Sequence, residues 1–325
     1  MVPNPGRTIH GVTSGRHYAS SDPIADAIGL LRPRSVVEAS LHASVPWAAR
    51  FDSYPHVKFG GVVRGECLLT VDGHDPVLLR EGDFFLLGNP PGYVLAGSPG
   101  VEPVDAATLW GGATGGVVRV GPPAADEAVF CGGHFSFDDT NAPLLLDVLP
   151  LLVHVRAADP RGAALAHLSA LLIAEIESTA VGGSLVLDHL AQILFVHMLR
   201  AHADDTDRPT GWLGALGDDG IGAALRALHA DVGHRWTLGE LAGLSHMSRS
   251  TFAAAFRNRV GTAPLTYLIE WRMCLARDAL RRGTRSISQL ASATGYESES
   301  AFSTAFRRVV GSSPAQFREA ARHGG

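Results

Sequence analysis

The sequence spells one phrase twice, and this repeat constrains the fold more than any other feature. Residues 244–264 read LSHMSRSTFAAAFRNRVGTAP, and residues 295–314 read GYESESAFSTAFRRVVGSSP. Four pairs agree at a constant offset of fifty residues: Phe252 and Phe302, Phe256 and Phe306, Gly261 and Gly311, and Pro264 and Pro314. Two apolar pairs further upstream agree at an offset of forty-nine, namely Leu238 with Ile287 and Leu241 with Leu290. The chain therefore contains one structural unit twice, with a residue inserted at a turn of the second copy.

Each copy predicts two short helices joined by a turn. In the first copy Thr237 is a good N-cap, and Glu240 follows at the spacing of a capping box. After a turn at residues 245–247, Ser248 can cap a second helix, in which an apolar residue recurs every four positions, at Phe252, Phe256 and Val260. This pattern indicates a helix-turn-helix unit.

The face opposite Phe252 in this second helix, and its counterpart in the other copy, is small, polar or basic. It holds Ser250, Ala253, Ala254, Arg257 and Asn258 in the first copy, and Ser300, Ser303, Thr304, Arg307 and Arg308 in the second. Such side chains suit the major groove of DNA, where phosphates attract cations and base edges offer hydrogen-bond partners. The alternative is an ordinary surface helix with its polar face in water. Two copies in one basic segment favour DNA binding.

Between the copies, residues 264–283 predict one long helix. Pro264 suits its first turn and Gly283 suits its end. An apolar stripe runs between them, formed by Leu265, Leu268, Ile269, Met273, Leu275, Ala276, Ala279 and Leu280. At ~1.5 Å per residue the helix spans roughly 28 Å, comparable with the ~34 Å between successive major grooves on one face of DNA. The helix can therefore act as a spacer between the two units.

Charge is divided unevenly along the chain. Residues 221–325 contain 14 arginines, no lysine and seven acidic residues, a net charge of +7. Residues 1–220 contain 13 basic and 25 acidic residues, a net charge of −12. The basic part alone is expected to bind a polyanion.

The stretch from Trp236 to Arg318 resembles the whole DNA-binding domain of the AraC/XylS transcription regulators. The resemblance rests on LGELAGLS, WRMCLARDALRRG and ISQLASATGYESESAFSTAFRRVVGSSPAQFR, of which the last is the most specific. It implies two helix-turn-helix units joined by a long helix, with recognition helices in adjacent major grooves of double-stranded DNA. It also implies base-facing roles for Arg249, Ser250, Ala253 and Ala254 in the first copy, and for Glu299, Ser300, Ser303 and Thr304 in the second.

The sequence departs from the family pattern at Ala253 and Ala254, where longer polar side chains often occur. Alanine can contact a thymine methyl group but cannot make a bidentate hydrogen bond to a base. We therefore expect Arg249 and the second recognition helix to carry more of the specificity. Further DNA contacts are expected from Arg257, Arg307 and Arg308.

The acidic N-terminal part predicts a small β-barrel. Residues 59–95 consist of short β-rich runs separated by the turn residues Gly65, Asp72-Gly73, Glu81-Gly82 and Pro90-Pro91-Gly92. The GD turn with the following apolar run and NPPG resembles the cupin barrel. The segment FCGGHFSFDDTNAPLLLDVLPLLVHV resembles the end of the cupin-type sensor domain of some AraC-like regulators. That resemblance is looser than the one in the DNA-binding part.

Metal-dependent cupin enzymes bind their ion through clustered histidine and glutamate. The second cupin motif would place a histidine where this chain has Leu95, and His56 has no His-x-His partner. A metal site would require His56, His74 and His134 to converge in space. We find no other catalytic constellation, so we expect neither catalysis nor a cofactor.

A barrel without metal still encloses a cavity that can hold a small effector. We expect the cavity to be lined by Trp47, His56, Phe59, Val63, Cys67, Phe85 and Leu87. A rival hypothesis is redox sensing through Cys67 and Cys131, which requires them to be close together and at least one to be an accessible thiol of low pKa. The three cysteines are too scattered for a disulfide scaffold.

Residues 161–202 predict two helices, with apolar residues at Leu165, Leu168, Leu172 and Ile176 and then at Leu187, Leu190, Leu194 and Met198. Their apolar residues exceed one stripe. Packing on the barrel of the same chain is one explanation; a homodimer interface, which the family resemblance implies, is the one we favour. His189 and His197 are expected to be polar interface or core residues rather than metal ligands.

The sequence thus predicts an α+β protein with a cupin-like barrel over residues 1–160, a helical dimerisation segment over 161–202, a linker over 203–220 and a DNA-binding domain over 221–325. The expected function is a sequence-specific transcriptional regulator that senses a small effector, with RNA polymerase as a further candidate partner. A cupin metalloenzyme and a purely architectural DNA-binding protein are the competing functions. No apolar run suits a membrane span or a secretory signal, so we expect a cytoplasmic protein.

Overall fold

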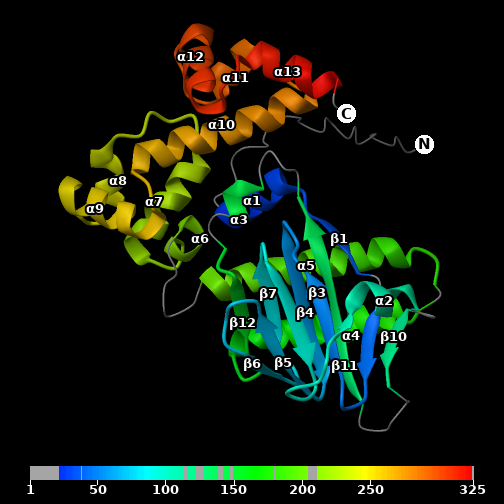
Figure 1. Cartoon of the computed structure of the whole chain (residues 1–325). Helices are drawn as coiled ribbons and strands as arrows, with labels where there is room; N and C mark the ends of the chain where they lie inside the picture. Colours follow the sequence, from blue (N-terminus) through cyan, green and yellow to red (C-terminus); the bar gives the residue numbers. More distant parts are fainter. Residues whose placement is uncertain are drawn as a thin grey trace, which may run out of the picture.

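The computed structural model describes residues 22–37, 39–112, 116–121, 127–137, 142–146, 149–178, 180–203 and 211–323. Figure 1 shows a β-rich half, with two long helices along one side of its sheets, and a helical half formed by the C-terminal part of the chain. This division matches the sequence, in which β-rich runs precede the helical repeat. None of the helices in these residues combines the length and apolar character that a membrane span requires.

The β-rich half consists of two facing sheets. The larger sheet has the strand order β10-β2-β11-β4-β7-β12, with β1 also paired to β11; the smaller has the order β6-β5-β8-β3-β9. The short helices of this half are α2 (Ala106–Gly111), α3 (Pro143–Leu146) and η1 (Pro160–Gly162). The strands are β1 (Arg34–Val36), β2 (Ser40–Ala43), β3 (Ala48–Asp52), β4 (Val57–Arg64), β5 (Glu66–Val71), β6 (Val77–Arg80), β7 (Phe84–Gly88), β8 (Gly92–Ala96), β9 (Val104–Asp105), β10 (Val117–Val120), β11 (Ala128–Ser136) and β12 (Leu152–Val155).

The larger sheet is buried on both faces, which explains the continuous apolar run Phe84-Phe85-Leu86-Leu87 in β7. Successive side chains of a strand point to opposite faces. Phe85 and Leu87 belong to the core between the two sheets. Phe84 and Leu86 belong to a second core on the other face, which the helices cover.

Two antiparallel helices, α4 (Ala163–Ile176) and α5 (Gly183–Ala203), cover this outer face (Figure 1). Their inner residues are fully buried: Leu165, Leu172, Leu194, Phe195 and Met198. Packing on the barrel therefore accounts for the predicted apolar spacing. Other apolar side chains of the same helices remain exposed: Leu171, Leu185, Val186 and Ile193.

The helical half begins with α6 (Trp212–Ala215) and α7 (Asp219–Ala230), and the repeat follows. The predicted long helix is α10 (Pro264–Arg282), closed by Gly283 in the left-handed conformation. The helices of the two helix-turn-helix units are α8 (Leu238–Leu244), α9 (Arg249–Val260), α11 (Ile287–Ala293) and α12 (Glu299–Val310), followed by α13 (Pro314–His323).

The predicted linker over residues 203–220 differs from the structure in its described part. Residues 212–215 form α6, and the side chains of Trp212 and Leu213 are buried in the same core as the helices of the barrel. Burial of these apolar side chains outweighs the glycines and acidic residues that suggested a flexible segment. Residues 204–210 lie outside the described residues.

A helix that the sequence reading did not predict joins the two halves. Helix α1 (Pro23–Leu31) is capped by Asp22, and Ile24, Ala27, Leu30 and Leu31 are buried in a core shared with α7 and α10. Two polar contacts accompany this packing. Arg32 donates to Asp278 at 2.7 Å, and a carboxylate oxygen of Asp26 lies 3.1 Å from Nδ1 of His229, whose side chain is fully buried.

Candidate DNA-binding surface and effector cavity

The two helix-turn-helix units are built by the same local interactions. Ser248 and Ser298 cap α9 and α12 by accepting the amides of Thr251 and Ala301. The supporting helices α8 and α11 each begin with a complete capping box, Thr237 with Glu240 and Ser286 with Gln289. Hydrogen bonds from Thr237 hold the pKa of Glu240 at about 2, because they favour its charged form.

The paired phenylalanines fix the orientation of both recognition helices. Phe252, Phe256, Phe302 and Phe306 have no exposed surface. With this face buried, the opposite face of α9 and α12 is turned outward. It carries Ser250, Ala253, Ala254 and Arg257 in α9, and Ser300, Ser303, Thr304, Arg307 and Arg308 in α12; Ala253 and Ser303 are half-buried and the others exposed. Arg249 and Glu299, the first residues of the two helices, are also exposed.

The two units are held together by more than the backbone of α10. The buried guanidinium of Arg272, in the middle of α10, donates to the carbonyl oxygens of Val232 (2.9 Å) and His234 (2.8 Å). The same guanidinium lies 5.8 Å from the ring centre of Tyr296 in the second unit. Gly295, with a φ of +78°, lies so close to Gly233 that an added Cβ would be 2.3 Å from the Gly233 carbonyl oxygen. The helix predicted as a spacer is therefore also the common core element of both units.

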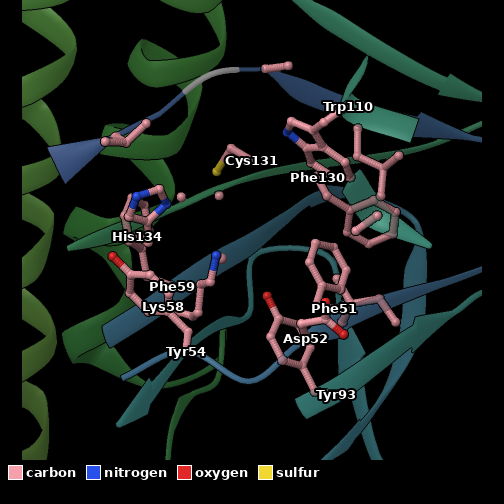
Figure 2. A pocket seen from close by; sticks show the side chains of 18 of the residues that line it. Phe51, Asp52, Tyr54, Lys58, Phe59, Tyr93, Trp110, Phe130, Cys131 and His134 are labelled. Atoms are coloured by element: carbon pink, nitrogen blue, oxygen red, sulfur yellow. The ribbon is translucent and has the colours of Figure 1, made fainter. Parts of the chain in front are cut away.

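A cavity of about 380 Å³ lies between the two sheets of the barrel. Figure 2 shows Tyr54, Lys58 and His134 toward one end of it, and Phe51, Tyr93, Trp110 and Phe130 toward the other. Helix α2 closes one side with Ala106, Ala107 and Trp110. Asp105 caps this helix by accepting the amide of Ala107, which places the Trp110 ring 5.5 Å from that of Phe51.

A pair of glycines lies in the cavity wall on the larger sheet. Gly60 in β4 is directly opposite Gly132 in β11, and the same face of these strands carries Lys58 opposite His134. Because side chains alternate along a strand, both glycines face the interior. The ring of Phe85 lies over Gly60, where an added Cβ would be 2.6 Å from it. Gly60 therefore needs to be glycine for Phe85 to pack on the sheet.

Of the residues expected to line the cavity, the structure places Phe59 and Phe85 on its wall. The other five lie elsewhere. Trp47 is buried with its ring 5.3 Å from that of Phe130, and Cys67 and Leu87 are also buried in the core between the sheets. Val63 packs against the core on the helical side. His56 accepts the amide of Phe137 at 3.4 Å, behind Tyr54.

Several cavity residues were missed by the sequence reading: Phe51, Tyr54, Lys58, Tyr93, Trp110, Phe130 and His134. Their strand positions follow from alternation once the pairing is known. The glycine pair at 60 and 132 also lies in this wall, and it becomes visible as a pair only when β4 and β11 are placed side by side.

The two cysteines considered for redox sensing are buried. Cys131 contributes to the cavity wall, whereas Cys67 does not. Burial raises the pKa of each thiol to about 12. A thiol that remains protonated at neutral pH is a poor nucleophile, so neither has the low pKa that the redox hypothesis requires.

The three histidines considered as metal ligands are arranged differently from one another. The rings of His56 and His134 flank that of Tyr54, at 5.9 and 4.9 Å between ring centres. His74 is exposed in the turn after β5, with Nδ1 3.0 Å from the carbonyl oxygen of Asp72. Within the described residues, no three His, Cys, Asp or Glu side chains form a group that could hold a metal ion.

Comparison with known proteins agrees with this two-part structure. A family model described as Cupin matches residues 22–204, and one described as Helix-turn-helix domain matches residues 241–320. A putative AraC-like transcription regulator of Streptomyces lividans is 41% identical over 300 residues, which are 92% of this chain and 98% of that protein. The HTH-type transcriptional regulator AlkR of Acinetobacter baylyi is 29% identical over 263 residues, 79% of this chain and 86% of that protein.

Among solved structures, the DNA-binding domain of the global transcriptional factor AdpA in complex with a target DNA is 33% identical. The match covers 33% of this chain and 96% of that one, with a TM-score of 0.31. The full-length relatives are named as regulators rather than enzymes. The chain therefore belongs to the AraC-like transcription regulators, with a cupin domain followed by a helix-turn-helix domain that binds double-stranded DNA.

Proposed function

We propose that this regulator reads specific DNA sequences through α9 and α12, and that a small effector in the barrel cavity controls this binding. The observation that carries the proposal is a cavity of about 380 Å³ in a domain that packs on α6, α7 and α10 and whose core continues into the first helix-turn-helix unit. This volume falls within the range of small-molecule pockets, about 300–1,000 Å³.

The segment before the first strand supports communication between the two halves. Val36, at the end of β1, lines the cavity, and β1 pairs with β11 beside it. Only a few residues earlier, α1 packs against α7 and α10, with Arg32 bound to Asp278. An effector that moves β1 would therefore act on the DNA-binding half through a continuous packed segment.

Base reading is assigned mainly to Arg249 in the first unit and to Glu299 and Ser303 in the second. This assignment follows from side-chain chemistry, since the alanines at 253 and 254 offer methyl groups alone. The guanidinium groups of Arg257, Arg307 and Arg308 are assigned to phosphate contacts.

We also propose that the chain forms a homodimer through the outer face of α4 and α5. Leu185 and Ile193 lie eight residues apart on one face of α5 and are 61% and 46% exposed, and Leu171 of α4 is 54% exposed. Exposed apolar side chains grouped on a helical layer are typical of an interface. A cytoplasmic location and contact with RNA polymerase complete the proposal.

The test is to purify the full-length protein from its own cells and to look for a bound small molecule by native mass spectrometry. One bound molecule per chain is expected in the wild type. The variant Leu95→Trp should bind none, because the larger side chain fills the cavity. Leu78→Trp is the control, because the side chain of Leu78 is exposed on β6. Thermal unfolding shows whether both variants fold. Removing the molecule should change the affinity for selected DNA. An unchanged affinity would contradict effector control.

A further inference from the structure

The cavity has features that distinguish among classes of small molecules, and the inference drawn from them rests on the proposed sensing function. Its wall on the side of the smaller sheet and α2 is rich in aromatic rings. Phe51 and Tyr93 stack with ring centres 4.6 Å apart and planes at 4°, and Trp110 meets Phe51 edge-on at 69°. Aromatic rings gain affinity from a stacked or edge-on partner beyond the burial of area. Such a wall favours a ligand that presents flat faces and ring edges.

The opposite wall carries a further aromatic ring. Phe85 lies over Gly60 and meets the Tyr93 ring edge-on, with ring centres 6.4 Å apart. Beside this ring a ligand would meet the backbone of β11 at Gly132, and glycine in a strand often marks a place where a ligand approaches the backbone closely. Aromatic rings therefore bound the cavity on both sides, and we call the space between them the slot.

The polar groups gather at one end of this slot. Lys58 and His134 are opposite each other on neighbouring strands, and the Tyr54 ring lies 4.5 Å from the Lys58 ammonium and 4.9 Å from the His134 ring. Burial raises the pKa of the Tyr54 hydroxyl, so it stays a hydrogen-bond donor. Of the two carboxylates nearby, Asp105 caps α2 and Asp52 is an exposed residue.

We propose that the cavity binds a planar aromatic molecule with an oxygen acceptor at one edge, its rings against Phe51, Tyr93, Trp110 and Phe85, and its oxygen toward Tyr54, Lys58 and His134. A sugar would leave most of its hydroxyl groups against apolar walls. A flexible chain would gain area burial but no ring contacts, and it would lose conformational entropy on entering the slot.

The test is isothermal titration of the full-length protein with three probes: 2-naphthol, 1-decanol and naphthalene. The first two have the same number of carbon atoms and one hydroxyl group each. 2-Naphthol should bind about tenfold or more tightly than 1-decanol if two or more rings contribute. Equal or tighter binding of 1-decanol, or no binding of 2-naphthol, would overturn the proposal.

Two variants locate the effect. Phe51→Leu keeps the site apolar and should reduce the preference for 2-naphthol over 1-decanol by about fivefold. Lys58→Met should reduce the preference for 2-naphthol over naphthalene by about fivefold to tenfold, because it removes a charged donor. Leu78→Phe, on exposed β6, should change neither preference. Preferences that stay as in the wild type in both cavity variants would place the ligand outside this slot.

The same probes separate this inference from the proposed sensing function. If 1-decanol is preferred and alters the affinity for DNA, the cavity is a sensor of another ligand class. If 2-naphthol binds as expected and the affinity for DNA stays constant, the ligand class is supported and effector control fails.

Discussion

At the residue scale, DNA recognition depends on which side chains of α9 and α12 face the duplex. The paired phenylalanines decide this, because their burial leaves one face of each helix outward. Arg257, Arg307 and Arg308 are exposed on that face and are the residues that we assign to phosphate contacts. Substitutions on this face can therefore separate phosphate contacts from base contacts.

Arg307→Ala and Arg308→Ala should each weaken binding to every DNA sequence by a similar factor. If each guanidinium contacts one phosphate, the slope of log K against log salt should fall by about one per substitution. Fluorescence anisotropy at several salt concentrations measures the slope. Arg80→Ala, on the exposed end of β6, is the control and should leave it unchanged. An unchanged slope in both test variants would place these arginines off the DNA.

Cys67 and Cys131 should resist alkylation in the folded chain. A pKa of about 12, raised by burial, leaves very little thiolate at pH 8. Reaction with iodoacetamide, followed by mass spectrometry, should be roughly a thousandfold slower than in the denatured chain. Alkylation of either cysteine at the denatured rate would restore the redox hypothesis.

At the element scale, the sequence predicted the helices of the repeat because caps, periodicity and end signals agree there. α10 begins at Pro264 and ends before Gly283, as its sequence indicates. α6 was mistaken for a linker because its four residues are too few to show a helical period. α1 has a good cap in Asp22, but its role depends on contacts with Asp278 and His229, some two hundred residues away.

The sequence predicted that a cavity exists in the barrel, but not which residues line it. Turn spacing indicated a barrel, and alternation gave each strand two faces. Which interior residues surround empty space depends on strand pairing, which brings Gly60 opposite Gly132. For this reason Trp47 and Cys67 were expected on the cavity wall, although they fill the core beside it.

The outer face of α5 should hold two chains together. Leu185→Glu combined with Ile193→Glu should convert a dimer into a monomer, because the charges would have to be buried at the interface. The melting temperature of the isolated chain should change little, since both side chains are exposed within it. Sedimentation velocity measures the state. Leu78→Glu, on β6, serves as the control, and a dimer that survives the double substitution would contradict this interface.

At the scale of the whole molecule, the two helix-turn-helix units differ in their attachment. The first shares a continuous core with α1 and the helices of the barrel, whereas the second has a separate core around Phe302 and Phe306. The two helix-turn-helix units are therefore similar in sequence but differ in the core into which they pack. The first unit is therefore the one whose core is continuous with that of the barrel.

Phe302→Ala should loosen the second unit alone. Removing a buried phenylalanine costs about 3–5 kcal/mol, and the loss should raise hydrogen exchange in α11, α12 and α13. Phe252→Ala, its counterpart in the first unit, should raise exchange in α7, α8 and α9 and extend to α1. Hydrogen exchange with mass spectrometry distinguishes the two patterns. The same spread in both variants would show that the two cores act as one.

The central claim is that one chain reads DNA with two recognition helices held at a fixed spacing by α10. The most direct measurement is selection of DNA from a random duplex pool by the full-length protein, followed by hydroxyl-radical footprinting of the selected sites. Two protected blocks per chain are expected on one face of the duplex, about one helical turn apart, near 10 base pairs. A single protected block, or a pool with no enriched sequence at any salt concentration, would contradict it.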